Sequence, residues 1–129
     1  MFPKDVQQAM YELMEETKNH KKYVVNFAMA YGGRAEIIDA TRKIAEQIKT
    51  GKLDVKEINE KVFEKNLYLK SAPELIIRTS QNRLSGFLLW QSAYSEIIFL
   101  PKRLWPEFSK RDLIKCINDY SNRERRFGK

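Results

Sequence analysis

The sequence has very few of the residues that cross-link chains or bind metals. Its 129 residues include one cysteine, Cys116, and one histidine, His20. A single cysteine excludes a disulfide bond within the chain and favours a reducing compartment. One cysteine and one histidine also argue against a structural zinc site, which needs four such ligands.

Long apolar runs are absent too. No run comes near the roughly 20 residues that a membrane-spanning helix needs. The first residues, Met-Phe-Pro-Lys, lack the apolar stretch of a secretory signal, so we expect a cytoplasmic protein. Repeats, low-complexity segments and interdomain linkers are also missing. With 43% hydrophobic and 32% charged residues, the chain is predicted to form one globular domain over residues 1–129.

The net charge of +7 leaves several partners open. A basic surface can simply keep a protein soluble. It can also bind nucleic acid, membrane headgroups or a phosphorylated substrate. No recognised nucleic-acid-binding motif is present, which argues against the first of these. The positions of the basic residues must therefore decide.

Apolar periodicity predicts helices that alternate with strands. Continuous apolar runs predict strands at residues 22–29, 75–77 and 97–100. Helical spacing is found over residues 5–18, between Gly33 and Gly51, after the capping pair Asp54 and Glu57, and after the capping pair Ser109 and Asp112. This order predicts an α/β fold with a mainly parallel sheet flanked by helices.

Two polar segments are expected at the carboxyl ends of strands, where such sheets bind ligands. One is Tyr-Gly-Gly-Arg at residues 31–34, and the other runs from Arg78 to Ser85 with two arginines and three hydroxyls. Arginine pairs with phosphate through two parallel hydrogen bonds, and hydroxyl and loop N–H groups complete such a site. The alternative is an ordinary polar loop.

Two further features have both a functional and an ordinary interpretation. Glu96, at the start of an apolar strand, is either solvent-facing or one ligand of a Mg²⁺ ion beside a phosphate. The basic end, residues 123–129, is either a solvated helix terminus or a cationic arm that reaches a phosphate.

Four blocks of sequence together resemble the cis-prenyltransferase family, which includes undecaprenyl diphosphate synthase. They are NFAMAYGGRAEI, LIIRTSQNRLSGFLLWQSAYSEIIF, LWPEF and RERRFG, in the order and approximate spacing of that family's C-terminal half. The resemblance implies transfer of prenyl groups. Isopentenyl diphosphate would be joined to an allylic diphosphate, with Mg²⁺, to give a cis-polyprenyl diphosphate.

The resemblance also implies roles for individual residues. Arg78, Arg83 and Ser85 match the residues that hold the isopentenyl diphosphate group, and Glu96 matches the glutamate linked to Mg²⁺. Arg126 and Gly128 match an Arg-x-Gly motif that reaches the active site of the partner subunit. Gly32, Gly33 and Arg34 match a motif that lines the site.

The sequence departs from the family in three ways. The first half, whose aspartate loop ionises the allylic diphosphate with Mg²⁺, is not represented, so we expect the chain to be inactive alone. Four residues separate Arg78 from Arg83, where the family usually has five. Ala30 and Gly86 stand where many bacterial relatives have asparagine.

Two functions in the same pathway remain open at this point. The chain is either part of a working enzyme, as a homodimer or with a chain that carries the aspartate loop, or a non-catalytic subunit of a two-component enzyme. A lipid product would also bring it to a membrane surface. A small nucleic-acid-binding domain is the third, disfavoured alternative.

Overall fold

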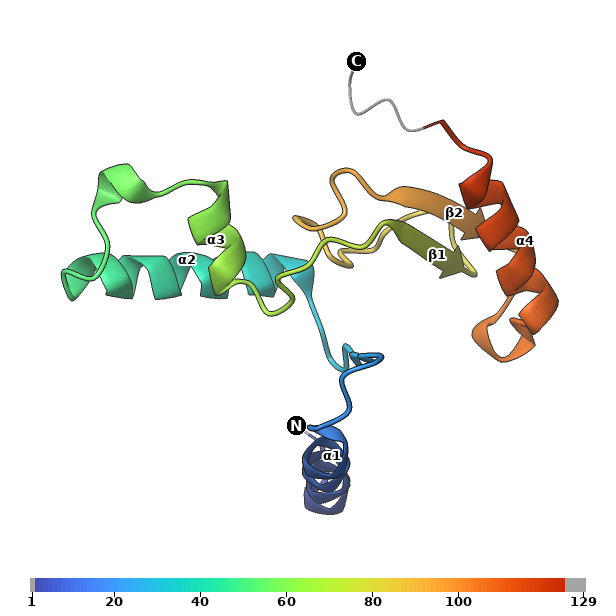
Figure 1. Ribbon diagram of the computed structural model, residues 1–129, viewed down its shortest axis with the longest axis horizontal. Coiled ribbons are helices and arrows are strands. Elements are labelled where there is room, and N and C mark those ends of the chain that lie inside the picture. The colour runs from blue at the N-terminus through green and yellow to red at the C-terminus, as the bar shows by residue number, and fades with distance from the viewer. Residues whose placement is uncertain (1, 125–129) are drawn as a thin grey trace.

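The computed structural model describes residues 2–124. The helices are α1 (Lys4–Thr17), α2 (Gly33–Lys49), α3 (Glu60–Asn66) and α4 (Lys110–Ser121), and the strands are β1 (Leu75–Thr79) and β2 (Glu96–Leu100). Two 3₁₀ turns, η1 (Val55–Glu57) and η2 (Trp105–Glu107), precede α3 and α4. Figure 1 shows α2 with α3 on one side, the sheet with α4 on the other, and α1 standing apart from both.

β1 and β2 form a two-stranded parallel sheet, which confirms the α/β fold class. Their register pairs Leu75 with Glu96 and Arg78 with Phe99. Because side chains alternate between the two faces of a strand, Arg78 and Glu96 lie on opposite faces of the sheet. α4 then runs back beside the sheet, so that Arg123, just after its end, reaches Glu96 at the start of β2.

The predicted helix caps are largely confirmed. The hydroxyl of Ser109 accepts from the N–H of Asp112, and the carboxylate of Asp112 accepts from the N–H of Ser109, which closes the box that begins α4. α2 ends where expected, with Gly51 at φ +71°. The box formed by Asp54 and Glu57 is present but caps η1, because Asn59 supplies the cap of α3.

The strand predicted at residues 22–29 is wrong. The segment belongs to no sheet, and its side chains are exposed: Tyr23 by 78%, Val24 by 77%, Val25 by 73% and Phe27 by 73%. A strand needs a neighbouring strand for its N–H and C=O groups, and β1 and β2 pair with each other rather than with this segment. The apolar pattern therefore predicts that residues 22–29 are buried, but the described part of the chain does not cover them.

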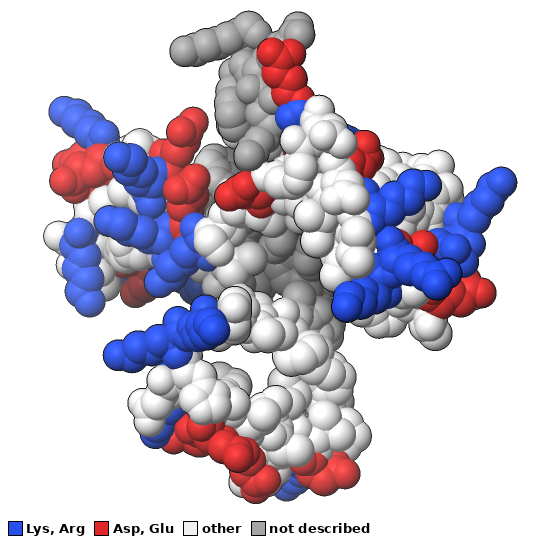
Figure 2. Space-filling view, turned by 45° about the vertical axis from the view of Figure 1, so that its right-hand side comes forward, with Lys and Arg blue, Asp and Glu red and all other residues white. Residues whose placement is uncertain are grey.

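The core is small for a chain of this size. Its buried apolar residues are Ala40, Ile44, Leu67, Ile76, Leu88, Ile98 and Cys116. The chain of 15.3 kDa exposes 11074 Å², against roughly 7,100 Å² for a compact monomer of that mass. Figure 2 shows much of this surface as uncharged, extending from the middle of the molecule down to α1.

Two smaller observations complete the fold. Burial raises the pKa of the Cys116 thiol, which lies on α4 and is 2% exposed. None of the helices within residues 2–124 is both long and apolar enough to span a bilayer.

Candidate functional site

The segment that follows β1 makes a tight turn. The N–H of Gln81 donates to the carbonyl of Thr79 at 2.8 Å, so the turn closes over a single residue, Ser80. Ser80 has φ +60°, the left-handed region, which is rare and strained for such a turn. Its N–H is held by two carbonyls, those of Arg103 at 2.8 Å and Leu100 at 3.1 Å. The turn is thus fixed to the end of β2.

Three side chains of this segment donate to one oxygen atom, Oε1 of Gln81. Arg83 donates from Nε at 3.0 Å and Ser85 from Oγ at 3.3 Å. Arg78, at the end of β1, donates from Nη2 at 3.5 Å. We call Arg78, Arg83 and Ser85 the donor cluster. The structure therefore brings together the three residues that the sequence assigned to a diphosphate, although their loop has one residue fewer than usual.

One more donor in the cluster is left over. The Nε atom of Arg78 is buried and has no hydrogen-bond partner among residues 2–124. A buried guanidinium nitrogen without an acceptor is costly, so it needs one from elsewhere.

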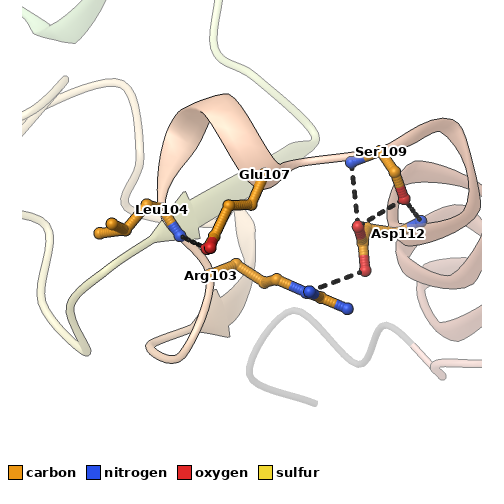
Figure 3. Close-up of polar contacts among 5 residues, drawn as sticks. All are labelled: Arg103, Leu104, Glu107, Ser109 and Asp112. Atoms are coloured by element: carbon orange, nitrogen blue, oxygen red, sulfur yellow. Dashed lines mark hydrogen bonds and ion pairs between the residues drawn. The ribbon is translucent and has the colours of Figure 1, made fainter.

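The Arg103 end of this arrangement is anchored by α4. Figure 3 shows Arg103 pairing through Nε with Asp112 at 3.4 Å, while Asp112 also closes the cap with Ser109. Glu107 accepts from the N–H of Leu104 at 2.9 Å. The hydrogen bonds from Ser109 lower the pKa of Asp112, with a smaller contribution from Arg103. These contacts hold the carbonyl of Arg103, and hence Ser80, in place.

Gly33 lies directly against the other end of the loop. Its N–H donates to the carbonyl of Gly86 at 3.0 Å. A Cβ at this position would come within 2.3 Å of that same carbonyl oxygen, so only glycine fits. Gly86, at φ +83°, and Ala30, at φ +52°, both adopt the region that glycine and asparagine tolerate best. The departure at Gly86 is therefore mild, whereas Ala30 is the more strained residue.

Sequence reasoning missed Glu36, the most buried charged residue, at 1% exposure. Its carboxylate accepts from the Tyr31 hydroxyl, from Gln91 Nε2 at 3.0 Å and from the N–H of Tyr68 at 2.8 Å. Burial, and then the bond to Glu36, raise the pKa of Tyr31. This one side chain ties α2 to the segments before β1 and before β2, and so positions Gly33 against Gly86.

A signal for Glu36 exists in the sequence, but on a different face of the helix. The buried residues of α2 are Gly33, Glu36, Ala40 and Ile44, spaced three and four apart. Apolar spacing in the sequence instead selects Ile37, Ile38, Thr41, Ile44, Ala45 and Ile48. Of these Ile44 is buried, but Ile38 is 51% exposed. An acidic residue four positions before Ala40 marks the buried face.

Glu96 does not join the donor cluster. It lies at the opposite end of the strands from Arg78, about 10 Å away along the strand direction, and on the other face. Its carboxylate pairs with Arg123 at 2.7 Å. The hydrogen bond to Glu96 raises the pKa of Arg123, and Asp119 adds to that effect.

The described residues by themselves do not fit a Mg²⁺ ion. No three acidic, histidine or cysteine side chains within residues 2–124 come together as a metal site. Glu96, the carboxylate assigned to Mg²⁺, is already neutralised by a guanidinium. It could supply at most one ligand, and the ion would need others.

The remaining predicted site residues are placed as follows. Gly32 caps the N-terminus of α2, and Arg34 is exposed in its first turn. Arg126 and Gly128 lie outside the described residues.

Two cavities lined by described residues lie away from the donor cluster. The larger, of about 560 Å³, has a mainly apolar lining that also includes Glu60, Glu64, Glu74 and Lys70, so its charged residues are more acidic than basic. The smaller, of about 350 Å³, lies along residues 26–31 and is mostly apolar. The donor cluster is therefore an exposed surface site in this chain.

The comparison with protein families decides the identity. Residues 1–128 match the family model "Putative undecaprenyl diphosphate synthase". The chain belongs to this family of prenyltransferases. It is 50% identical over 132 residues to the tritrans,polycis-undecaprenyl-diphosphate synthase (geranylgeranyl-diphosphate specific) of Methanopyrus kandleri, covering 100% of this chain and 48% of that protein.

Two further relatives agree with this assignment. An isoprenyl transferase of Streptococcus pyogenes is 47% identical, over 99% of this chain and 54% of its own length. The crystal structure of lavandulyl diphosphate synthase from Lavandula x intermedia in complex with dimethylallyl diphosphate matches with a TM-score of 0.94 and 36% identity, over 99% of this chain and 56% of that one. The chain thus spans about half the length of the relatives it matches.

Proposed function

We propose that this chain supplies the isopentenyl diphosphate site of a cis-prenyltransferase, which joins isopentenyl diphosphate to an allylic diphosphate. The observation that carries the proposal is the donor cluster, in which two guanidinium groups and a hydroxyl converge on one oxygen. Charged donors converging in this way suit the crowded oxygens of a diphosphate.

In this role the chain binds and orients one substrate. Arg78 and Arg83 would neutralise the diphosphate, and Ser85 would donate to one of its oxygens. The fixed turn at Ser80 and the contact between Gly33 and Gly86 would keep the donors in register with the sheet. Gly32 and Arg34 would line the same edge.

The rest of the catalytic site would come from residues outside this stretch. Glu96 and the donor cluster lie on opposite faces and at opposite ends of the strands, so one chain could not apply both to one diphosphate. We therefore propose that the working form is an assembly, either a homodimer or a complex with a chain carrying the aspartate loop. In that assembly Glu96 would supply one ligand to Mg²⁺. Arg126 and Gly128 would contact the diphosphate in the partner's site. Retention of the donor cluster favours this role over that of a non-catalytic partner subunit.

Binding of isopentenyl diphosphate tests the proposal. Each hydrogen bond to a charged group contributes about 1.5–3 kcal/mol, so Arg83→Ala should weaken binding roughly ten- to a hundredfold in calorimetry, and added salt should weaken binding to the wild-type chain. Arg111→Ala is the matched control, since it removes the same charge from an exposed position on α4. Equal binding by both variants would contradict the proposal.

A further inference from the structure

The oxygen that gathers the donor cluster belongs to the chain itself. We propose that Gln81 is a built-in occupant of the anion site: its amide oxygen accepts from Arg78, Arg83 and Ser85 and competes with a diphosphate oxygen for the same donors. The inference rests on the proposed function, because it requires the donor cluster to be an anion site. It adds a residue that sets the affinity of that site.

The hydrogen bonds at Gln81 are those of a poor acceptor, whose place a phosphate oxygen would fill better. An amide oxygen is neutral and has two lone pairs, yet three donors are directed at this one. Only the contact from Arg83, at 3.0 Å, has an ordinary hydrogen-bond length, whereas those from Ser85 and Arg78 are stretched to 3.3 and 3.5 Å. A phosphate oxygen carries charge and more lone pairs, so it would satisfy the same donors better.

The backbone directs Gln81 into the cluster and leaves its side chain free to move. The turn over Ser80 is pinned by the carbonyls of Leu100 and Arg103. Gln81 is itself exposed, so rotation of its side chain into solvent requires no rearrangement of the loop. Displacement therefore costs only the hydrogen bonds that Gln81 makes.

The short loop gives this residue its position. With four residues between the two arginines, Gln81 stands only two positions before Arg83 and four before Ser85. In this shortened loop the amide oxygen of Gln81 therefore reaches the point on which the donors converge.

Calorimetric titration of the full chain with inorganic pyrophosphate tests the inference. Light scattering should first show that the wild-type chain and each variant have the same association state. Gln81→Ala removes the competing acceptor and should bind pyrophosphate about two- to tenfold more tightly, the value of one modest hydrogen bond. Gln81→Glu places a charged acceptor in the site and should bind more than about tenfold more weakly. Asn82→Asp is the matched control, because it adds the same charge one residue away and should have a much smaller effect.

A second measurement follows the site without pyrophosphate. In the wild-type chain the Arg83 Nε–H is hydrogen-bonded to Gln81, so its NMR signal should exchange slowly with water. Gln81→Ala should speed that exchange, and pyrophosphate should slow it again.

The outcomes separate the inference from the proposed function. If Gln81→Ala binds pyrophosphate no more tightly than the wild-type chain, or if Gln81→Glu and Asn82→Asp weaken binding equally, the inference is wrong while the anion site stands. If Arg83→Ala binds as the wild-type chain does, or if neither the wild-type chain nor Gln81→Ala binds pyrophosphate, the proposed function itself is overturned.

Discussion

The loop after β1 and residues 2–29 are both largely exposed, but for different reasons. The loop consists of polar groups that largely satisfy one another: Ser80 with two carbonyls, and the donor cluster with Gln81. The N-terminal segment exposes apolar side chains to water, among them Tyr23, Val24 and Phe27, and no residue of α1 is buried. The loop can therefore take up its geometry within this chain, whereas residues 4–29 need a surface that the described residues do not offer.

The strongest way to sharpen this contrast is to supply that surface. We expect the chain alone to self-associate at tens of micromolar in light scattering, because it exposes contiguous apolar side chains. It should also show no prenyl transfer with Mg²⁺. A polypeptide corresponding to the other half of a relative should suppress self-association and bring turnover from undetectable to measurable in a radiolabelled isopentenyl diphosphate assay.

The control for complementation is the same polypeptide with the aspartate of its loop replaced. It should suppress self-association without restoring turnover. Chain elongation by this chain alone, or a clean monomer with a cooperative melt, would remove the basis of the comparison.

A smaller effect is expected where the loop meets α2. Gly33→Ala places a Cβ within 2.3 Å of the Gly86 carbonyl oxygen, which must shift the backbone. Overpacking of this kind costs about 1–3 kcal/mol in the free energy of unfolding, which urea denaturation measures. Gly32→Ala is the matched control, since its Cβ would meet nothing closer than 3.9 Å. Equal costs at the two positions would mean that the contact with Gly86 is not tight in solution.

The smallest effect concerns the anchor of the loop at the start of α4. The pKa of Asp112 is lowered in the folded chain, chiefly by Ser109. A lowered folded pKa contributes stability above the ordinary aspartate pKa, and this is lost as the pH falls through the folded value. The urea concentration at the midpoint of unfolding should therefore fall as the pH is lowered below about 4. Ser109→Ala should flatten part of that drop. An identical pH profile in the variant would show that this cap contributes no stability through Asp112.

Local chemistry explains what the sequence predicted well. Ser109 with Asp112, and Gly51 after α2, are short-range signals that act within a few residues, and both formed as expected. β1 and β2 were recognisable because their apolar runs are bounded by polar residues. Residue type and position after a strand left the segment from Arg78 to Ser85 open as a phosphate site or an ordinary loop, and the family resemblance selected Arg78, Arg83 and Ser85.

Longer-range features were harder to predict. The apolar run at residues 22–29 has the composition of a buried strand, but composition does not say which chain covers it. Glu36 was passed over because a buried carboxylate is only understandable once its donors, Tyr31, Tyr68 and Gln91, are brought together by the fold. Glu96 was matched to the Mg²⁺-linked glutamate by the family resemblance, and only the strand register shows that it lies at the opposite end of the strands from Arg78.

Cys116 gives the protein a reporter of its own motion. Its thiol is enclosed where α4 covers the sheet, and burial keeps it protonated, so a thiol-specific reagent can react only when the helix lifts. The rate of labelling then measures how often this part of the molecule opens. Since the chain has one cysteine, that rate belongs to a single place. Binding of a diphosphate or of a second polypeptide can then be followed by whether the labelling rate of Cys116 falls.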